Sequence, residues 1–215
     1  MNPFSTLWER LTSAQLRRLR VLNSPFKIQA FLDQVPYCPR DLYRSPLSIM
    51  RGRSASCLDG ALMASLLLRS LGHPPMILEM VADSDDDHII ALYKRYGLWG
   101  ALAKSEFAGL RSREPVYRTL RELVLSYFPF YYNIKAAHTL RAYTVPLRLE
   151  KFDRSEWVIN DKKVRDISDA LDCQRQIRLF SARSARNLQL VDKRIYESEI
   201  IGSAHERSYR FYMKS

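Results

Sequence analysis

Residues 56–72 read SCLDGALMASLLLRSLG and form the longest apolar run of the chain. Ser56 and the acidic Asp59 three residues later have the form of a capping box, which predicts that a helix begins at Cys57. Gly72 favours an end of this helix, and the two prolines that follow soon afterwards prevent it from continuing. Because few polar residues interrupt the run, the helix is predicted to be mostly buried.

Cys57 is therefore expected in the first turn of this helix. The unpaired backbone N–H groups and the positive end of the helix dipole favour the thiolate there, and the thiolate is the nucleophilic form of cysteine. A cysteine at the N-terminal end of a buried helix is typical of cysteine acyl-transfer enzymes. The alternative is a free cysteine that packs as a small hydrophobic side chain.

Three short apolar segments after the helix predict strands over residues 76–81, 88–94 and 98–103. An acidic turn over residues 83–87 separates the first two strands, and a short turn over 95–97 separates the last two. Such close neighbours are most simply an antiparallel meander with the helix packed on one face.

His88 begins the second of these strands, 31 positions after Cys57 (88 − 57). A thiol nucleophile needs a base that accepts its proton and later delivers it to the leaving group. Histidine suits both steps because its unperturbed pKa is near neutrality. We expect the helix N-terminus and the start of this strand to meet on one face of the sheet.

Several segments together carry a family resemblance: residues 56–61 (SCLDGA), 67–75 (LLRSLGHPP), 87–93 (DHIIALY) and 98–102 (LWGAL). They resemble the cysteine helix, the histidine strand and the following strand of the transglutaminase-like superfamily, the papain-like cysteine enzymes with catalytic residues in the order Cys, His, Asp. Residues 113–117 (REPVY) also look like a stretch that recurs in uncharacterised bacterial members.

The resemblance implies an α+β fold with a papain-like core, in which the buried helix packs on an antiparallel sheet. It implies Cys57 as the nucleophile and His88 as the base. Where the family has its aspartate, this chain has Ala, Lys and Ser. Ser105 is the candidate third catalytic residue, because its hydroxyl can accept a hydrogen bond from the imidazole, although it brings no negative charge. Glu106 and Asp87 are the alternatives.

The whole chain is predicted to be one structural unit, since 215 residues are enough for one sizeable core. We expect a helical N-terminal arm over residues 1–50, the transglutaminase-like core over 51–135 and a C-terminal α/β extension over 136–215. Extra helices thus lie at both ends of the core. Near the end of the core, residues 116–128 predict an amphipathic helix. In the extension, residues 139–149 predict a further strand.

Composition describes an ordinary globular protein, with 47% hydrophobic and 27% charged residues. No stretch reaches the roughly 18 uncharged apolar residues of a membrane span, and the first ten residues are too charged for a secretory signal. Cys38, Cys57 and Cys173 are widely spaced, without a disulfide or metal pattern. We therefore expect free thiols in a reducing cytoplasm, and neither a metal nor a cofactor.

The formal net charge of +11 raises the question of a polyanionic partner. Arginines such as those in residues 17–20 alternate with leucines at helical spacing, which is typical of solvated helix faces. No recognised reading motif accompanies the charge. Nucleic-acid binding is therefore less favoured than a protein or peptide substrate.

The function predicted from these features is a cysteine-dependent hydrolase or acyltransferase that acts on an amide bond. Cys57 attacks the carbonyl, His88 moves the proton and a thioester forms. Water as the acceptor gives a protease or amidase, and an amine gives a transglutaminase-type transfer. The alternative is a catalytically inactive binding or scaffold module on the same fold, with a polyanionic partner. The missing aspartate and the basic charge motivate this alternative.

Overall fold

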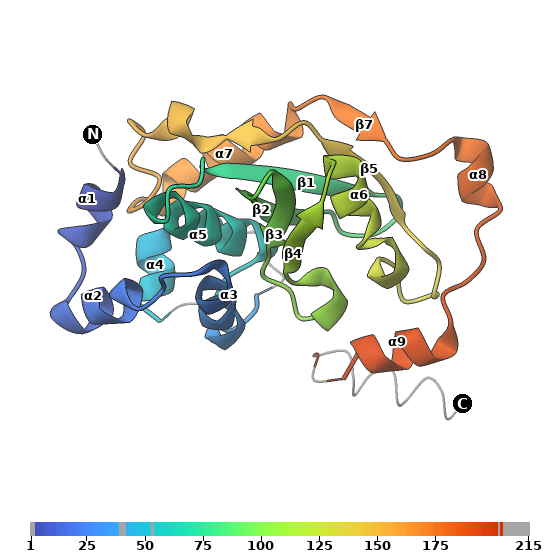
Figure 1. The fold of residues 1–215 in the computed structure, drawn as a ribbon, viewed down its shortest axis with the longest axis horizontal. Helices are drawn as coiled ribbons and strands as arrows, with labels where there is room; N and C mark the ends of the chain where they lie inside the picture. The colour runs from blue at the N-terminus through green and yellow to red at the C-terminus, as the bar shows by residue number, and fades with distance from the viewer. Residues whose placement is uncertain (1–2, 39–41, 53, 202, 204–215) are drawn as a thin grey trace.

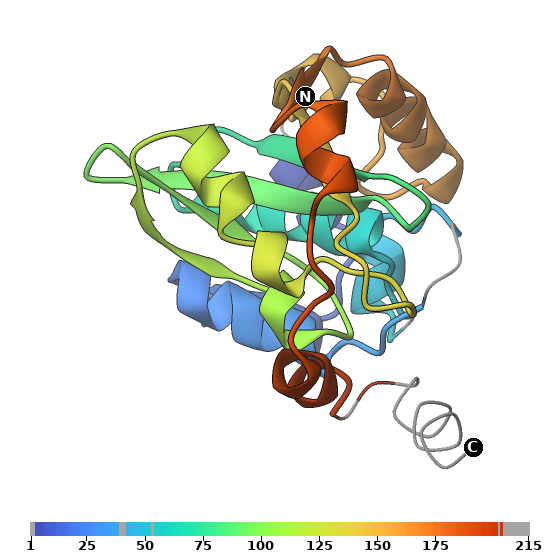
Figure 2. The ribbon, with the colours of Figure 1, turned by 90° about the vertical axis from the view of Figure 1, so that its right-hand side faces the viewer.

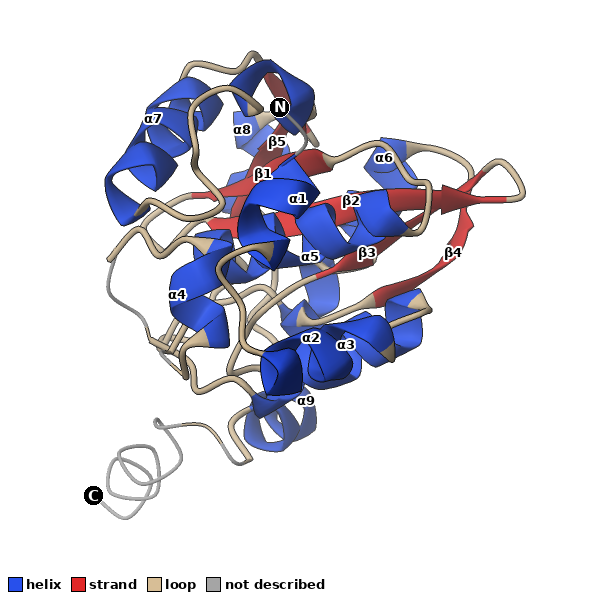
Figure 3. Ribbon diagram, turned by 90° about the vertical axis from the view of Figure 1, so that its left-hand side faces the viewer, coloured by secondary structure: helices blue, strands red, loops and turns tan. Residues whose placement is uncertain are grey.

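The computed structural model describes residues 3–38, 42–52, 54–201 and 203. In this part of the chain, the strands form a seven-stranded antiparallel sheet with helices on both faces (Figure 1, Figure 3). The strands are β1 (Met76–Ala82), β2 (His88–Arg95), β3 (Leu98–Leu102), β4 (Arg113–Tyr117), β5 (Leu140–Thr144), β6 (Leu147–Arg148) and β7 (Gln176–Arg178). The α-helices are α1 (Pro3–Trp8), α2 (Ser13–Arg20), α3 (Pro25–Gln34), α4 (Pro46–Met50), α5 (Cys57–Ser70), α6 (Leu120–Leu125), α7 (Asp161–Asp172), α8 (Ala182–Arg186) and α9 (Lys193–Glu199). Short 3-10 helices are η1 (Ala108–Leu110), η2 (Phe128–Phe130) and η3 (Leu149–Phe152).

The order of strands across the sheet is β4-β3-β2-β1-β5-β7, and β6 also pairs with β1. The predicted meander is confirmed, because β1 pairs with β2 and β2 pairs with β3, both antiparallel. In this register, Met80 lies opposite His88 and Ala91 lies opposite Leu102. The α+β fold class with an antiparallel sheet is therefore confirmed.

Helix α5 begins at Cys57 because the predicted capping box forms. The Ser56 hydroxyl accepts a hydrogen bond from the Asp59 backbone N–H at 3.3 Å, and the Asp59 carboxylate accepts one from the Ser56 N–H at 3.0 Å. The helix is buried along most of its length and packs on the sheet face that carries Ile77 and Ile89. Side chains of α3, α4 and α7 complete the core on this face.

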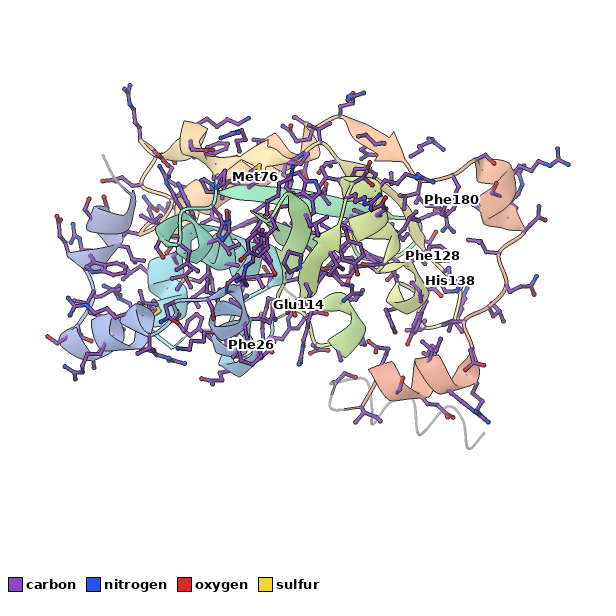
Figure 4. All side chains as sticks on the ribbon, viewed as in Figure 1. Phe26, Met76, Glu114, Phe128, His138 and Phe180 are labelled. Atoms are coloured by element: carbon purple, nitrogen blue, oxygen red, sulfur yellow. The ribbon has the colours of Figure 1, made fainter. Side chains whose placement is uncertain are left out.

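The opposite face of the sheet carries Leu78, Met80 and Ile90 and packs against α6. Because both faces are covered, β1 and β2 have nearly continuous apolar sequences instead of alternating ones. Aromatic rings extend this second layer (Figure 4): Phe128 stacks on His138 with ring centroids 4.5 Å apart, and it meets Phe180 edge-on.

Two predicted elements differ from the structure in extent. Residues 113–117, expected in part to be helical, form β4 at the edge of the sheet, and α6 begins only after its own capping box at Thr119. Pairing with β3 satisfies the backbone of this edge segment and overrides its helical pattern. The strand predicted over 139–149 is divided into β5 and β6, which pair with opposite ends of β1.

Helices α1 and α9 lie at opposite ends of the described part of the chain (Figure 1), and α9 lies below the sheet in the view of Figure 2. Helices α1 to α4 lie on the side of α5, whereas β7 extends the sheet at its far edge beside β5. Helix α9 contacts η2, close to the end of the sheet where β2 begins. Among the described residues, every helix is too short or too polar to cross a bilayer.

Candidate active site

Cys57 is the first residue of α5 and is half-buried. Its backbone N–H lies in the first turn, where intrahelical acceptors are missing. The Cys57 sulfur lies 4.0 Å from the carbonyl oxygen of Asp87, the residue directly before His88. The nucleophile candidate therefore lies at the end of the sheet where β2 begins.

A second segment runs beside the residues that precede Cys57. Tyr37 forms a parallel bridge with Ala55, in which the Ala55 N–H donates to the Pro36 carbonyl and the Cys38 N–H donates to the Ala55 carbonyl. Burial raises the pKa of Tyr37, and the negative charge of a Cys57 thiolate raises it further. Tyr37 is thus a neighbour of Cys57 that the sequence analysis did not identify.

His88 is the first residue of β2 and is buried, with 6% of its surface exposed. Its Nε2 atom lies 2.9 Å from the carbonyl oxygen of Leu110. Because a carbonyl can only accept a hydrogen bond, Nε2 carries the proton and Nδ1 is the nitrogen that can accept one. Burial lowers the pKa of His88 to about 4; the Leu110 carbonyl opposes this shift and the positive charge of Arg113 adds to it.

The sheet register places the imidazole of His88 on the face covered by α6. His88 lies opposite Met80, and both Met80 and Ile90 belong to the layer that packs against α6. Side chains alternate between faces along a strand, so Ile89 points toward α5 instead. This differs from the expectation that both candidates meet on one face. Within the described residues, no hydrogen bond joins the imidazole to the Cys57 sulfur.

Ser105 lines the same cleft as His88, but its hydrogen bonds are made with other residues. It is buried, its hydroxyl accepts a hydrogen bond from the Phe107 N–H at 3.0 Å, and its carbonyl accepts one from Arg111 Nε at 3.3 Å. The partner of His88 Nε2 is the backbone of Leu110 instead. No signal in the sequence could have identified Leu110, because every residue has a backbone carbonyl.

The two alternatives for the third residue also have other surroundings. One carboxylate oxygen of Asp87 accepts a hydrogen bond from the Ala82 N–H at 2.7 Å, and burial raises the pKa of Asp87. Glu106 is half-buried, and its negative charge contributes to the raised pKa of Tyr37. The only hydrogen bond found for the His88 ring among the described residues is the one to Leu110.

A contact with α3 occupies the place where the family resemblance predicts an aspartate. The Gln29 side chain forms two hydrogen bonds with the backbone of Ala103. Lys104 is buried, and its ammonium donates to the Leu32 carbonyl at 2.9 Å. Lys104 also passes very close to Gly60 of α5. This segment therefore connects the sheet to two helices.

A cleft of about 250 Å³ opens beside His88 at this end of the sheet. Carboxylates, aromatic rings and part of α9 surround it; its lining includes Tyr37, Asp86, His88, Ser105, Tyr131 and Tyr196. Cys57 adjoins this cleft through Asp87 and Tyr37, both of which line it. The cleft gives the buried imidazole an opening toward solvent.

Helix α9 of the C-terminal extension forms one wall of the cleft. The Tyr196 ring stacks on Tyr132 with centroids 5.1 Å apart, and the Tyr196 hydroxyl donates to the Ile134 carbonyl. The Glu199 carboxylate accepts a hydrogen bond from the Gly109 N–H at 2.5 Å. Residues at and directly after α9 therefore form part of the cleft wall.

Comparison with known proteins finds no matching family model and no matching curated protein. The comparison with solved structures finds two structures of LapG from Legionella pneumophila, one of them EGTA-treated. The EGTA-treated structure has 12% identity and a TM-score of 0.42, over 78% of this chain and 98% of that one. The other has 13% identity and a TM-score of 0.41, over 78% and 96%. Similarity this low assigns neither a family nor an activity to this chain.

Proposed function

We propose that this chain is a cysteine-dependent hydrolase or acyltransferase that acts on an amide bond of a protein or peptide, on a distant transglutaminase-like fold. Cys57 is the nucleophile and His88 is the base. The observation that carries the proposal is the position of the Cys57 sulfur. It lies at the N-terminus of a buried helix and 4.0 Å from the carbonyl oxygen that precedes His88, beside a cleft that His88 lines.

In the proposed reaction, the Cys57 thiol gives its proton to Nδ1 of His88, and the sulfur bonds to the amide carbon. The carbon–nitrogen bond then breaks, and the amine leaves with the proton from the imidazolium. Water or a second amine attacks the thioester, which releases an acid or a new amide and restores the thiol. Backbone N–H groups at a helix N-terminus are donors of the kind that stabilise a developing oxyanion, and Cys57 is the first residue of α5.

This reaction requires the sulfur and Nδ1 to come within hydrogen-bond distance when substrate occupies the cleft. Catalytic hydrogen bonds are commonly long in free enzymes and shorten in the substrate complex. The proposal also places the protein in a reducing compartment, the cytoplasm, because the nucleophile must remain a thiol.

A catalytically inactive binding module is the second candidate. The observation that favours it is the placement of the imidazole on the α6 face, with a neutral carbonyl as its partner. In that case, the cleft binds a ligand and Cys57 is a packing residue. The reactivity of the thiol distinguishes the two candidates.

The test is iodoacetamide labelling of each cysteine between about pH 5 and pH 9, the range that spans shifted and free thiols. Cys38 is half-buried like Cys57 and is the matched control, and Cys173 is the exposed control. We expect Cys57 to label about tenfold faster than either at pH 5.5, and His88→Ala to remove the difference. Equal labelling of the three thiols at the acidic end would contradict the enzyme proposal.

A thiol-directed activity probe provides the second measurement. It should modify the wild type and fail to modify Cys57→Ala, while the double variant Cys38→Ser with Cys173→Ser keeps full labelling. Modification that persists in Cys57→Ala would show that the reactive group is elsewhere.

A further inference from the structure

Turn η1 supplies the acceptor for the His88 imidazole. Leu110 is the last residue of this turn, and its carbonyl oxygen lies 2.9 Å from His88 Nε2. A short surface turn has few internal hydrogen bonds and does not by itself fix the direction of a carbonyl. Another group must therefore hold the turn in place.

The guanidinium of Arg113 holds this turn from the side of α6. Its Nη2 atom donates to the Gly109 carbonyl at 2.6 Å, and its Nη1 atom donates to the Ser112 carbonyl at 3.0 Å. Its remaining donors reach the hydroxyl and the carbonyl of Ser126 at 2.9 and 3.1 Å. The guanidinium also lies over the Tyr127 ring, 3.9 Å from its centroid.

Three further contacts restrict the same turn, and one of them is the hydrogen bond from the Gly109 N–H to the Glu199 carboxylate. The Tyr127 hydroxyl donates to the Arg111 carbonyl at 2.9 Å. A Cβ at Gly109 would lie 2.4 Å from the Phe130 ring, so only glycine allows this close approach. Arg113 is thus the centre of a set of contacts that connects η1 to α6 and η2.

We propose that Arg113 is the positioning residue for His88: through η1 it directs the Leu110 carbonyl at Nε2–H and so keeps Nδ1 as the proton acceptor. In enzymes of the Cys–His type, an acceptor on the far nitrogen fixes the tautomer and orientation of the ring. A guanidinium and a backbone carbonyl supply that function here in place of a carboxylate. The role of Nδ1 as acceptor rests on the proposed function; the role of Arg113 does not.

The test is nitrogen NMR of the His88 ring, assigned by comparison with His88→Gln. We expect the wild type to carry its proton on Nε2. Arg113→Gln removes the guanidinium and its charge. Arg113→Lys keeps the positive charge but lacks the planar guanidinium that donates to several carbonyls at once. Both variants should therefore show a mixture of the two His88 tautomers. Arg118→Gln removes one charge from an exposed position nearby and should leave the ring nitrogens unchanged.

Cys57 labelling in the same variants connects the tautomer to reactivity. Loss of orientation should slow Cys57 labelling at pH 5.5 by up to about tenfold in Arg113→Gln and Arg113→Lys, toward the rate of the control cysteines and of His88→Ala, because a misoriented imidazole no longer accepts the thiol proton. If the tautomers mix and labelling is unchanged, the positioning role stands and the proposed function is contradicted.

Two results would overturn the inference itself. One is a wild-type His88 protonated on Nδ1. The other is a folded Arg113→Gln whose ring nitrogens match those of the wild type. If Arg113→Gln does not fold by circular dichroism, the milder Arg113→Lys decides by the same criterion.

Discussion

At the residue scale, Gly60 shows how tightly α5 packs against the sheet. A Cβ at this position would lie 2.2 Å from the Lys104 Cβ, which is far inside van der Waals contact. Alanine normally stabilises a helix by about 1 kcal/mol relative to glycine. We expect the opposite here: Gly60→Ala should lower the free energy of unfolding by about 3 kcal/mol, because the clash displaces backbone.

The control for this prediction is Gly72→Ala. A Cβ at Gly72 would have no other atom within 4 Å, so the cost of this substitution comes from the positive φ of 89°. That strain alone costs about 1–2 kcal/mol. Urea unfolding of both variants checks the prediction. A Gly60→Ala variant as stable as the wild type would show that α5 and Lys104 can move apart without loss of stability.

Glu79 is a buried carboxyl group on the α5 side of β1. Burial raises its pKa to about 7, and the charges of Asp87 and Asp172 add to the shift. A carboxyl whose folded pKa is raised stabilises the fold below its unfolded pKa and loses that contribution as pH rises through the folded value. Glu79 therefore weakens the fold progressively between about pH 4.5 and pH 7.

We expect Glu79→Gln to leave stability unchanged near pH 4.5 and to raise the free energy of unfolding by about 2 kcal/mol at pH 8. Denaturant unfolding at several pH values provides the measurement. Exposed Glu114 on β4 (Figure 4) is the matched control, because Glu114→Gln removes the same charge at the surface. If Glu79→Gln had the same free energy of unfolding as the wild type at every pH, the raised pKa of Glu79 would be contradicted.

At the element scale, Asp161 joins α7 to α4. Its Oδ1 atom accepts hydrogen bonds from the Ser45 N–H at 2.8 Å and from the hydroxyls of Ser45 and Ser48 at 2.6 and 2.7 Å. The C-terminal extension is thereby connected to the N-terminal arm beside the same core. Hydrogen bonds to a charged group are stronger than those between neutral groups.

Asp161→Ala should therefore lower the free energy of unfolding by about 3 kcal/mol, because two buried hydroxyls and an N–H lose their acceptor. Asp166→Asn on the same helix is the control: its exposed ion pair with Lys163 should contribute less than about 1 kcal/mol. Thermal melts monitored by circular dichroism compare the two. Equal effects would mean that α4 and α7 are held together by apolar packing alone.

At the scale of the whole molecule, His88 makes the free energy of unfolding decrease as the pH falls. Its pKa is about 4 in the fold and near 6.5 in the unfolded chain, so the unfolded state binds a proton first as pH falls. The stabilisation is complete above about pH 6.5 and is lost as pH decreases toward 4. Its size is about 3 kcal/mol, from 1.36 kcal/mol per pKa unit.

His88→Gln tests this dependence, because the amide can still donate to Leu110 but does not titrate. We expect the free energy of unfolding of the wild type to fall more steeply than that of the variant between pH 6.5 and pH 4.5. Parallel curves would indicate that the imidazole charges without cost in the fold. The measurement is independent of any activity.

Local signals were sufficient for the elements that build the site. The capping box at Ser56 fixes where α5 begins, and the apolar runs with short turns fix the β1–β2–β3 meander. Residues 116 and 117 were assigned to the following helix instead of to β4, because the strand they pair with, β3, is not visible in a local pattern. The catalytic roles of Cys57, His88 and Ser105 remain predictions, as do the domain boundaries.

The sequence by itself determined which residues carry reactive groups: a cysteine at a helix start, and a histidine at the start of a strand one residue after Asp87. Only the tertiary structure decided where those groups point. The antiparallel register places His88 opposite Met80 on the α6 face, and Arg113 and η1 bring a backbone carbonyl to its ring. A shift of one residue along a strand moves a side chain to the other face of the sheet, and this shift depends on strand pairing. A backbone carbonyl acceptor has no sequence signature, because every residue has a carbonyl.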